Sequence, residues 1–121
     1  MTPEQTSENA NLALKHRLYV SGWMLSSSLI HAREYPRHYY INLKYNDEGL
    51  PIGVICVHIR GINNEIGSIQ VFVRKSERRK GYGTELINIM YDEWSGISLR
   101  HDDGIKGSRL FWENTIIKSE N

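Results

Sequence analysis

The most informative segment of the chain is Val71-Phe72-Val73-Arg74-Lys75-Ser76-Glu77-Arg78-Arg79-Lys80-Gly81-Tyr82-Gly83-Thr84-Glu85-Leu86. It combines a β-branched segment, a basic turn with two glycines and the start of an amphipathic helix. Backbone N–H groups in such a turn and in the first helical turn have no intrahelical acceptor, and the helix dipole adds about half a positive charge there. The stretch therefore predicts an anion site.

The residues of this turn favour a diphosphate. Gly81 and Gly83 have no side chain that would block the approach of a ligand to the backbone. Arg78, Arg79 and Lys80 add positive charge around the same N–H groups. Neither the P-loop spacing nor the three-glycine dinucleotide pattern fits the turn.

The turn resembles the acetyl-CoA signature of the GNAT superfamily, R/Q-x-x-G-x-G/A, and reads here Arg78-Arg79-Lys80-Gly81-Tyr82-Gly83. The resemblance extends from residue 39 to about residue 112, because the elements around the motif follow the family's order. It implies an α/β (α+β), GNAT-like fold: a mixed sheet with an antiparallel meander, then strand, helix, strand and a short C-terminal helix. It also implies that the motif and Thr84 bind acetyl-CoA, the co-substrate.

The resemblance places the catalytic groups on the strand before the motif. Main-chain atoms of Val71 and Val73 would pair with the pantetheine arm of acetyl-CoA, and a backbone amide of this strand would meet the acetyl carbonyl. Gly67 stands where the family has a glutamate base. Glu65, two residues earlier and so expected on the same face, is the nearest acid. It is either the base or an exposed turn residue.

The residue at the position of the general acid differs most clearly from the family pattern. The family commonly has a tyrosine on its fourth helix, and Trp112 stands there in this chain. An indole N–H is a donor only and does not reprotonate a thiolate. Solvent, Tyr82, Tyr91 or Ser108 would then supply the proton. The predicted catalytic residues are Glu65, Val71 and Tyr82.

Two functions remain open at this point. The first is an N-acetyltransferase that acts on a protein lysine, an N-terminus or a small amine. The alternative is a reduced GNAT-like domain that binds a partner or acts as an inhibitor, with little or no turnover. Because the chain ends soon after residue 112, part of the acceptor wall is expected to come from a homodimer or a protein partner.

The length and composition predict one folded unit. With 121 residues, 40% hydrophobic and 24% charged, the chain suits a single soluble domain. We expect a disordered leader at residues 1–8, the domain at 9–117 and a polar tail at 118–121. Helices are expected after a cap at Ser7 or Asn9, over 23–34 and over 84–95, the last with Leu86, Ile87 and Met90 on one apolar stripe. Strands are expected over 39–45 with one face on the core, over 52–60 with both faces covered, and over 66–74, with a turn at 46–49 that suits Gly49. Shorter strands at 97–100 and 115–117 and a helix at 110–112 would follow.

Charge, cysteine content and histidine spacing limit the ligands and the cellular location that we expect. The net charge of +1 gives no global attraction to nucleic acid. Five of the seven residues from 74 to 80 are basic, which leaves a nucleic-acid contact there as a third function, but no wider basic face in the sequence supports it. Cys56 is the only cysteine and lies in an apolar run, which predicts a core residue, with His58 a weak candidate to activate it. The five histidines lack metal-ligand spacing, so no metal is expected. Without a signal-peptide pattern or a membrane span, a cytoplasmic protein is expected.

Overall fold

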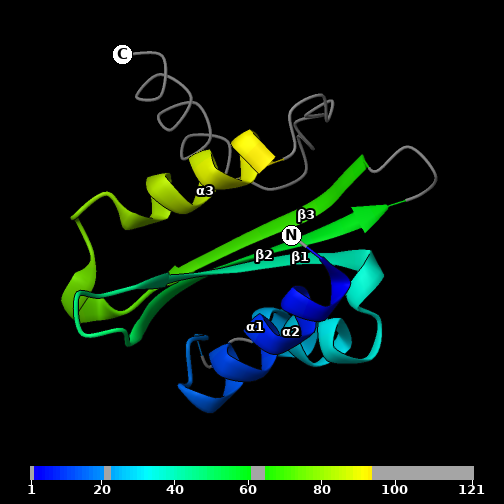
Figure 1. Cartoon of the computed structure of the whole chain (residues 1–121), viewed down its shortest axis with the longest axis horizontal. Coiled ribbons are helices and arrows are strands. Elements are labelled where there is room, and N and C mark those ends of the chain that lie inside the picture. Colours follow the sequence, from blue (N-terminus) through cyan, green and yellow to red (C-terminus); the bar gives the residue numbers. More distant parts are fainter. Residues whose placement is uncertain (1, 21–22, 61–64, 94–121) are drawn as a thin grey trace.

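The computed structural model describes residues 2–20, 23–60 and 65–93 (Figure 1). Over these residues the elements are, in order, α1 (Pro3–Lys15), α2 (Trp23–Glu34), the 3-10 turn η1 (Pro36–His38), β1 (Tyr39–Tyr45), β2 (Pro51–Arg60), β3 (Glu65–Val73), the 3-10 turn η2 (Lys75–Glu77) and α3 (Tyr82–Glu93). Helices α1 and α2 cover one face of the sheet and α3 covers the other, as Figure 1 shows. The predicted α/β fold class is confirmed.

The three strands form an antiparallel meander in the order β1-β2-β3. Seven consecutive residues of β2, from Pro51 to Val57, are buried, which confirms the prediction of a central strand covered on both faces. The β1–β2 turn also forms as predicted. Gly49 has φ 81°, and the Asn46 side-chain oxygen accepts the N–H groups of Glu48 and Leu50 at 3.0 and 2.9 Å.

Two hydrophobic cores lie on opposite faces of the sheet. On one face, Ile41 and Val54 pack with residues of α1 and α2. On the other face, Tyr40, Ile55 and Val57 pack with Leu86, Ile87 and Met90 of α3. The expectation that β1 has only one face on the core is therefore wrong, because Tyr40 is buried against α3 while its neighbour Ile41 is buried against α1 and α2.

The N-terminal prediction needs a correction. Residues 3–8, expected in a disordered leader, belong to α1, because Thr2 caps the helix in place of Ser7 or Asn9. The Thr2 hydroxyl accepts the Gln5 N–H at 3.2 Å, and Gln5 Oε1 accepts the Thr2 N–H at 2.8 Å. This reciprocal pair is a capping box, with Pro3 at the first helical position. Asn9 instead donates from Nδ2 to the Ile41 carbonyl at 2.7 Å, at the outer edge of β1.

Helix α3 positions the predicted site. It begins at Tyr82, two residues before the predicted start, and its buried stripe of Leu86, Ile87 and Met90 follows the predicted spacing. The elements expected at 97–100, 110–112 and 115–117 lie outside the described residues, as do Trp112 and Ser108. Among the described helices, none combines the length and the hydropathy that crossing a bilayer requires.

Candidate functional site

The loop from β3 to α3 is closed by its own hydrogen bonds before it reaches the helix. The Glu77 N–H donates to the Arg74 carbonyl at 2.8 Å, and the Arg78 N–H donates to the Lys75 carbonyl at 3.4 Å. Arg79 and Gly81 then adopt left-handed backbone conformations, with φ 67° and φ 81°. These two conformations turn the chain from the end of the sheet into α3.

A row of backbone donors follows this closed part of the loop. Within the described part of the chain, the N–H groups of residues 79–84 donate to no acceptor. The first N–H of the region that is bonded belongs to Glu85, which donates to the Gly81 carbonyl at 3.0 Å. Unpaired N–H groups at a helix start bring partial positive charge, and they can be satisfied by an anion or by water. An anion bound to these N–H groups stays a prediction from the sequence.

Gly81 meets a conformational requirement in this loop. Its φ of 81° lies in the left-handed region that L side chains rarely adopt, and a Cβ added there would meet no atom within 4 Å. The backbone beside the donors is therefore open on the side where a side chain would otherwise stand. A phosphate fits such a surface, because its oxygens must come close to the backbone N–H groups and no side chain of Gly81 stands between them.

The three basic side chains of the motif make different contacts. Arg78 turns back to the sheet, where its Nε donates to the Val73 carbonyl at 2.9 Å and its guanidinium carbon lies 5.5 Å from the centre of the Phe72 ring. Lys80 Nζ lies 2.9 Å from Glu77 Oε2. Arg79 is exposed and forms no ion pair or side-chain hydrogen bond within the described chain. Of the three, Arg79 is the one whose side chain has no partner among the described residues.

Among the described strands, β3 pairs only with β2, and its outer edge, here called the free edge, lies beside this loop. The Arg74 N–H donates to the Ile52 carbonyl at 2.9 Å, which fixes the residues of β3 that bond to β2. Because every second residue of an antiparallel strand bonds to the same neighbour, Val71 and Val73 direct their N–H and C=O groups away from β2. The Val73 carbonyl accepts a hydrogen bond from the Arg78 side chain, which fits this orientation. Both valines thus have main-chain groups at the edge where the resemblance places the cofactor arm.

A bulge in β3 changes the argument for Glu65. His58 pairs with Ser68, but Ile59 pairs with Ile66, so Gly67 is an additional residue in β3. Beyond this bulge Ile66 packs in the same core cluster as Ile69 and Val71. The inference that positions 65 and 67 share a face required an uninterrupted strand, and this strand is interrupted there. An added Cβ at Gly67 would meet the Arg60 side chain at 2.7–2.9 Å.

Tyr82 lies at the first position of α3, with its ring near β1. Lys44 Nζ of β1 lies 5.2 Å from the centre of the Tyr82 ring and 2.7 Å from Glu85 Oε1. β1 is the strand farthest from the free edge of β3. The Tyr82 ring thus contacts a side chain of β1, and its predicted catalytic role stays a prediction. Lys44 and Glu85 were not predicted, since a pair so far apart in sequence has no local pattern.

The other titratable candidates are structural. Burial raises the pKa of the Tyr91 hydroxyl to about 12, and the ring packs on the α3 side of the sheet. Burial also raises the pKa of the Cys56 thiol to about 12, and Cys56 is buried in the core as predicted. Among the described residues, no three His, Cys, Asp or Glu side chains are grouped to hold a metal ion.

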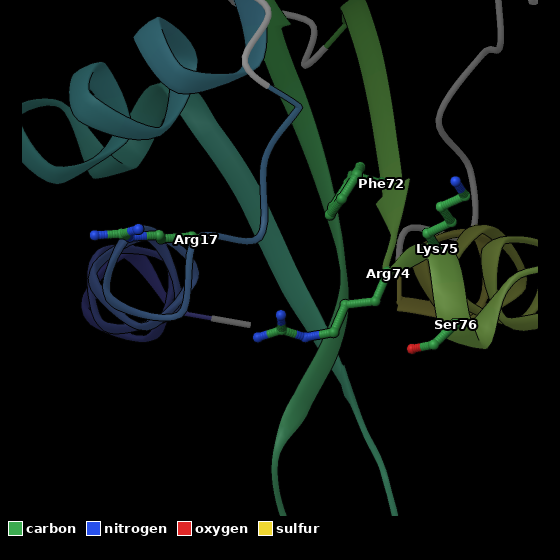
Figure 2. A pocket seen from close by; sticks show the side chains of 5 residues that line it. All are labelled: Arg17, Phe72, Arg74, Lys75 and Ser76. Carbon is green, nitrogen blue, oxygen red and sulfur yellow. The ribbon is translucent and has the colours of Figure 1, made fainter.

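A hollow of about 520 Å³ lies on the α1 side of this region and is lined by Arg17, Phe72, Arg74, Lys75 and Ser76. Figure 2 shows Arg74 reaching from the end of β3 towards α1, where it donates to the His16 and Pro51 carbonyls at 2.9 and 3.1 Å. The guanidinium of Arg17 points away from Arg74 in the same view. Arg74 therefore joins α1, β2 and β3, and the basic residues from 74 to 80 do not form one continuous charged face.

Comparison with known proteins assigns the family. The model of the Acetyltransferase (GNAT) family matches residues 9–95. This match covers more than half of the chain, including β3, the basic loop and α3. The chain therefore belongs to the GNAT acetyltransferase family, which confirms the resemblance seen in the sequence. A comparison with curated proteins returned no match.

Proposed function

We propose that this protein is an N-acetyltransferase that moves the acetyl group of acetyl-CoA to an amine of a protein lysine, an N-terminus or a small molecule. The observation that carries the proposal is the row of unpaired N–H groups over residues 79–84, at the start of α3 in a chain of the GNAT family. Such a row suits the diphosphate of the cofactor, because its partial positive charge and open backbone match a compact double anion.

The loop residues have separate roles in the proposed binding. The N–H groups of residues 79–84 would hold the phosphate oxygens, and Gly81 would keep the backbone accessible to them. Arg79 would add a charge-assisted contact, since its side chain has no partner within the described chain. Arg78 and Lys80 add positive charge nearby while bonded to Val73 and Glu77.

The free edge of β3 supplies the second part of the proposed site. The main-chain groups of Val71 and Val73 would pair with the amide groups of the pantetheine arm, as an added strand pairs with a sheet edge. A backbone N–H at this edge would donate to the acetyl carbonyl as its oxygen gains negative charge. The side chains at 71 and 73 take no part, so another apolar residue there should preserve binding.

Proton transfer completes the proposed reaction. When bound, acetyl-CoA supplies the thioester; the amine nitrogen forms the new C–N bond, the C–S bond breaks, and the sulfur leaves as a thiolate. The proposed base, which takes the ammonium proton directly or through water, is Glu65; this assignment rests on its being the nearest acid in the sequence, at the start of β3, since the bulge at Gly67 removes the shared-face argument. Since the ring of Tyr82 lies near Lys44 of β1, we assign reprotonation of the thiolate to solvent.

Release of free thiol from acetyl-CoA in the presence of a panel of amines tests the proposal. The panel should include a lysine peptide, a peptide with a free N-terminus and a polyamine. We expect amine-dependent thiol release by the wild type. Mass spectrometry should show about 42 Da added to the acceptor, the mass of one acetyl group in place of a hydrogen. Binding of acetyl-CoA without thiol release for any amine would support the binding-protein alternative and contradict the proposal.

A further inference from the structure

Arg78, the first residue of the motif, uses its side chain within the protein. Its Nε donates to the Val73 carbonyl at 2.9 Å, and its guanidinium lies over the Phe72 ring at 5.5 Å. Both partners belong to the end of β3, so one side chain holds the loop against the strand that it has just left. Arg78 is exposed, so burial does not explain this placement.

The bond from Arg78 completes a closed segment. Residues 74–78 are already joined by the bonds from Glu77 to Arg74 and from Arg78 to Lys75. The side-chain bond of Arg78 adds a third link, which reaches one residue further back to Val73. The unpaired N–H groups begin at the next residue, Arg79. Arg78 is therefore the last anchored residue before the donors.

The same bond also limits the free edge of β3. The Val73 carbonyl points away from β2 and would be free without Arg78. With this carbonyl satisfied, the N–H of Val73 and both main-chain groups of Val71 are the groups at this end of the edge that have no partner in residues 2–20, 23–60 and 65–93. A ligand that pairs with the edge would therefore end its pairing at a defined residue.

We infer that Arg78 is a positioning residue, which fixes the row of N–H donors relative to the edge of β3 by donating to the Val73 carbonyl. This inference rests on the proposed function for its consequence in CoA binding. What the role requires is an N–H donor of suitable length, and the positive charge is secondary. A neutral glutamine at position 78 can donate from its amide, whereas a methionine of similar length cannot.

The test compares Arg78→Gln with Arg78→Met, because both remove the charge and only the methionine removes the donor. Calorimetry with CoA should give a Kd for Arg78→Gln within about threefold of the wild type and for Arg78→Met about tenfold weaker or more, the size expected of one lost hydrogen bond. Lys75→Gln removes a charge from the same loop at an exposed residue and serves as the control for charge alone. Equal weakening in both Arg78 variants would overturn the inference in favour of a charge role.

A second readout does not depend on CoA. Backbone ¹⁵N relaxation in the free protein should show lower order parameters for residues 79–83 in Arg78→Met than in the wild type, and unchanged values in Arg78→Gln. Unchanged values in Arg78→Met would overturn the positioning role. If the wild type binds no CoA, the proposed function fails, and the relaxation data alone then decide the role of Arg78.

Discussion

Lys44 of β1 and Glu85 of α3 form an ion pair with 2.7 Å between Nζ and Oε1, across the face of the sheet that α3 covers. The same lysine lies near the ring of Tyr82, the first residue of the helix. These contacts join the start of α3, which carries the proposed phosphate donors, to the far strand of the sheet. β1 thus contacts the start of α3, although it contributes no group to the proposed site.

We expect the Lys44–Glu85 pair to contribute little to stability. The side chains are 25% and 45% exposed, and surface pairs of this kind are worth about 0.2–1 kcal/mol. A double-mutant cycle of Lys44→Met and Glu85→Gln, measured by urea unfolding, should give a coupling energy in that range that falls as salt is added. A coupling far larger than this would show that the pair is protected from solvent, contrary to the structure.

The contribution of the N-terminal capping box to the free energy of unfolding should be measurable. Thr2→Ala removes the acceptor of the Gln5 N–H and should lower the free energy of unfolding by about 1 kcal/mol. Gln5→Ala removes the other bond of the pair and should cost less, because the Thr2 N–H can be reached by water. Thermal unfolding of both variants checks this. No change in Thr2→Ala would mean that residues 2–5 do not close the helix in solution.

Some features of the fold could be predicted from the sequence and others could not. The bounds of β1, the two covered faces of β2 and the buried stripe of α3 were predicted correctly, because repeated apolar residues at strand or helix spacing reflect burial directly. The cap at Thr2 has a local signature, Thr-Pro-Glu-Gln, which was predictable, although Ser7 and Asn9 were the predicted caps. The bulge at Gly67 could not be predicted, because it depends on the pairing of β3 with β2. The bond from Arg78 to Val73 likewise exists only once the loop has closed.

The stability of the protein should fall as the pH drops below neutral, in part through His58. Burial lowers the pKa of this imidazole, and the charges of Arg60, His38 and His31 lower it further. The unfolded state then binds a proton more readily than the folded state, so stability is lost as the pH falls through about 6.5 towards the lowered pKa. Unfolding midpoints from pH 8 to pH 5 should vary less in His58→Gln. An equally steep dependence in the variant would contradict this assignment.

Arg79 should contribute to cofactor affinity through its charge. Arg79→Gln leaves the backbone donors in place but removes the guanidinium that has no partner in the described chain. We expect acetyl-CoA binding to weaken by up to about tenfold at low salt and to depend less on salt than in the wild type. Arg33→Gln on α2, also exposed, is the matched control and should bind as the wild type does. An unchanged Kd in Arg79→Gln would remove Arg79 from the proposed site.

Calorimetry with acetyl-CoA on the wild type, Gly81→Val and Gly49→Val tests most directly whether the backbone at the start of α3 holds the cofactor. Both glycines have φ 81° and open space at Cβ, so each substitution should cost about 1–2 kcal/mol of stability. Gly49 lies in the β1–β2 turn, outside the row of donors. We predict binding by the wild type and Gly49→Val and none by Gly81→Val. Equal binding by the two folded variants, or no heat with the wild type, would contradict the central claim.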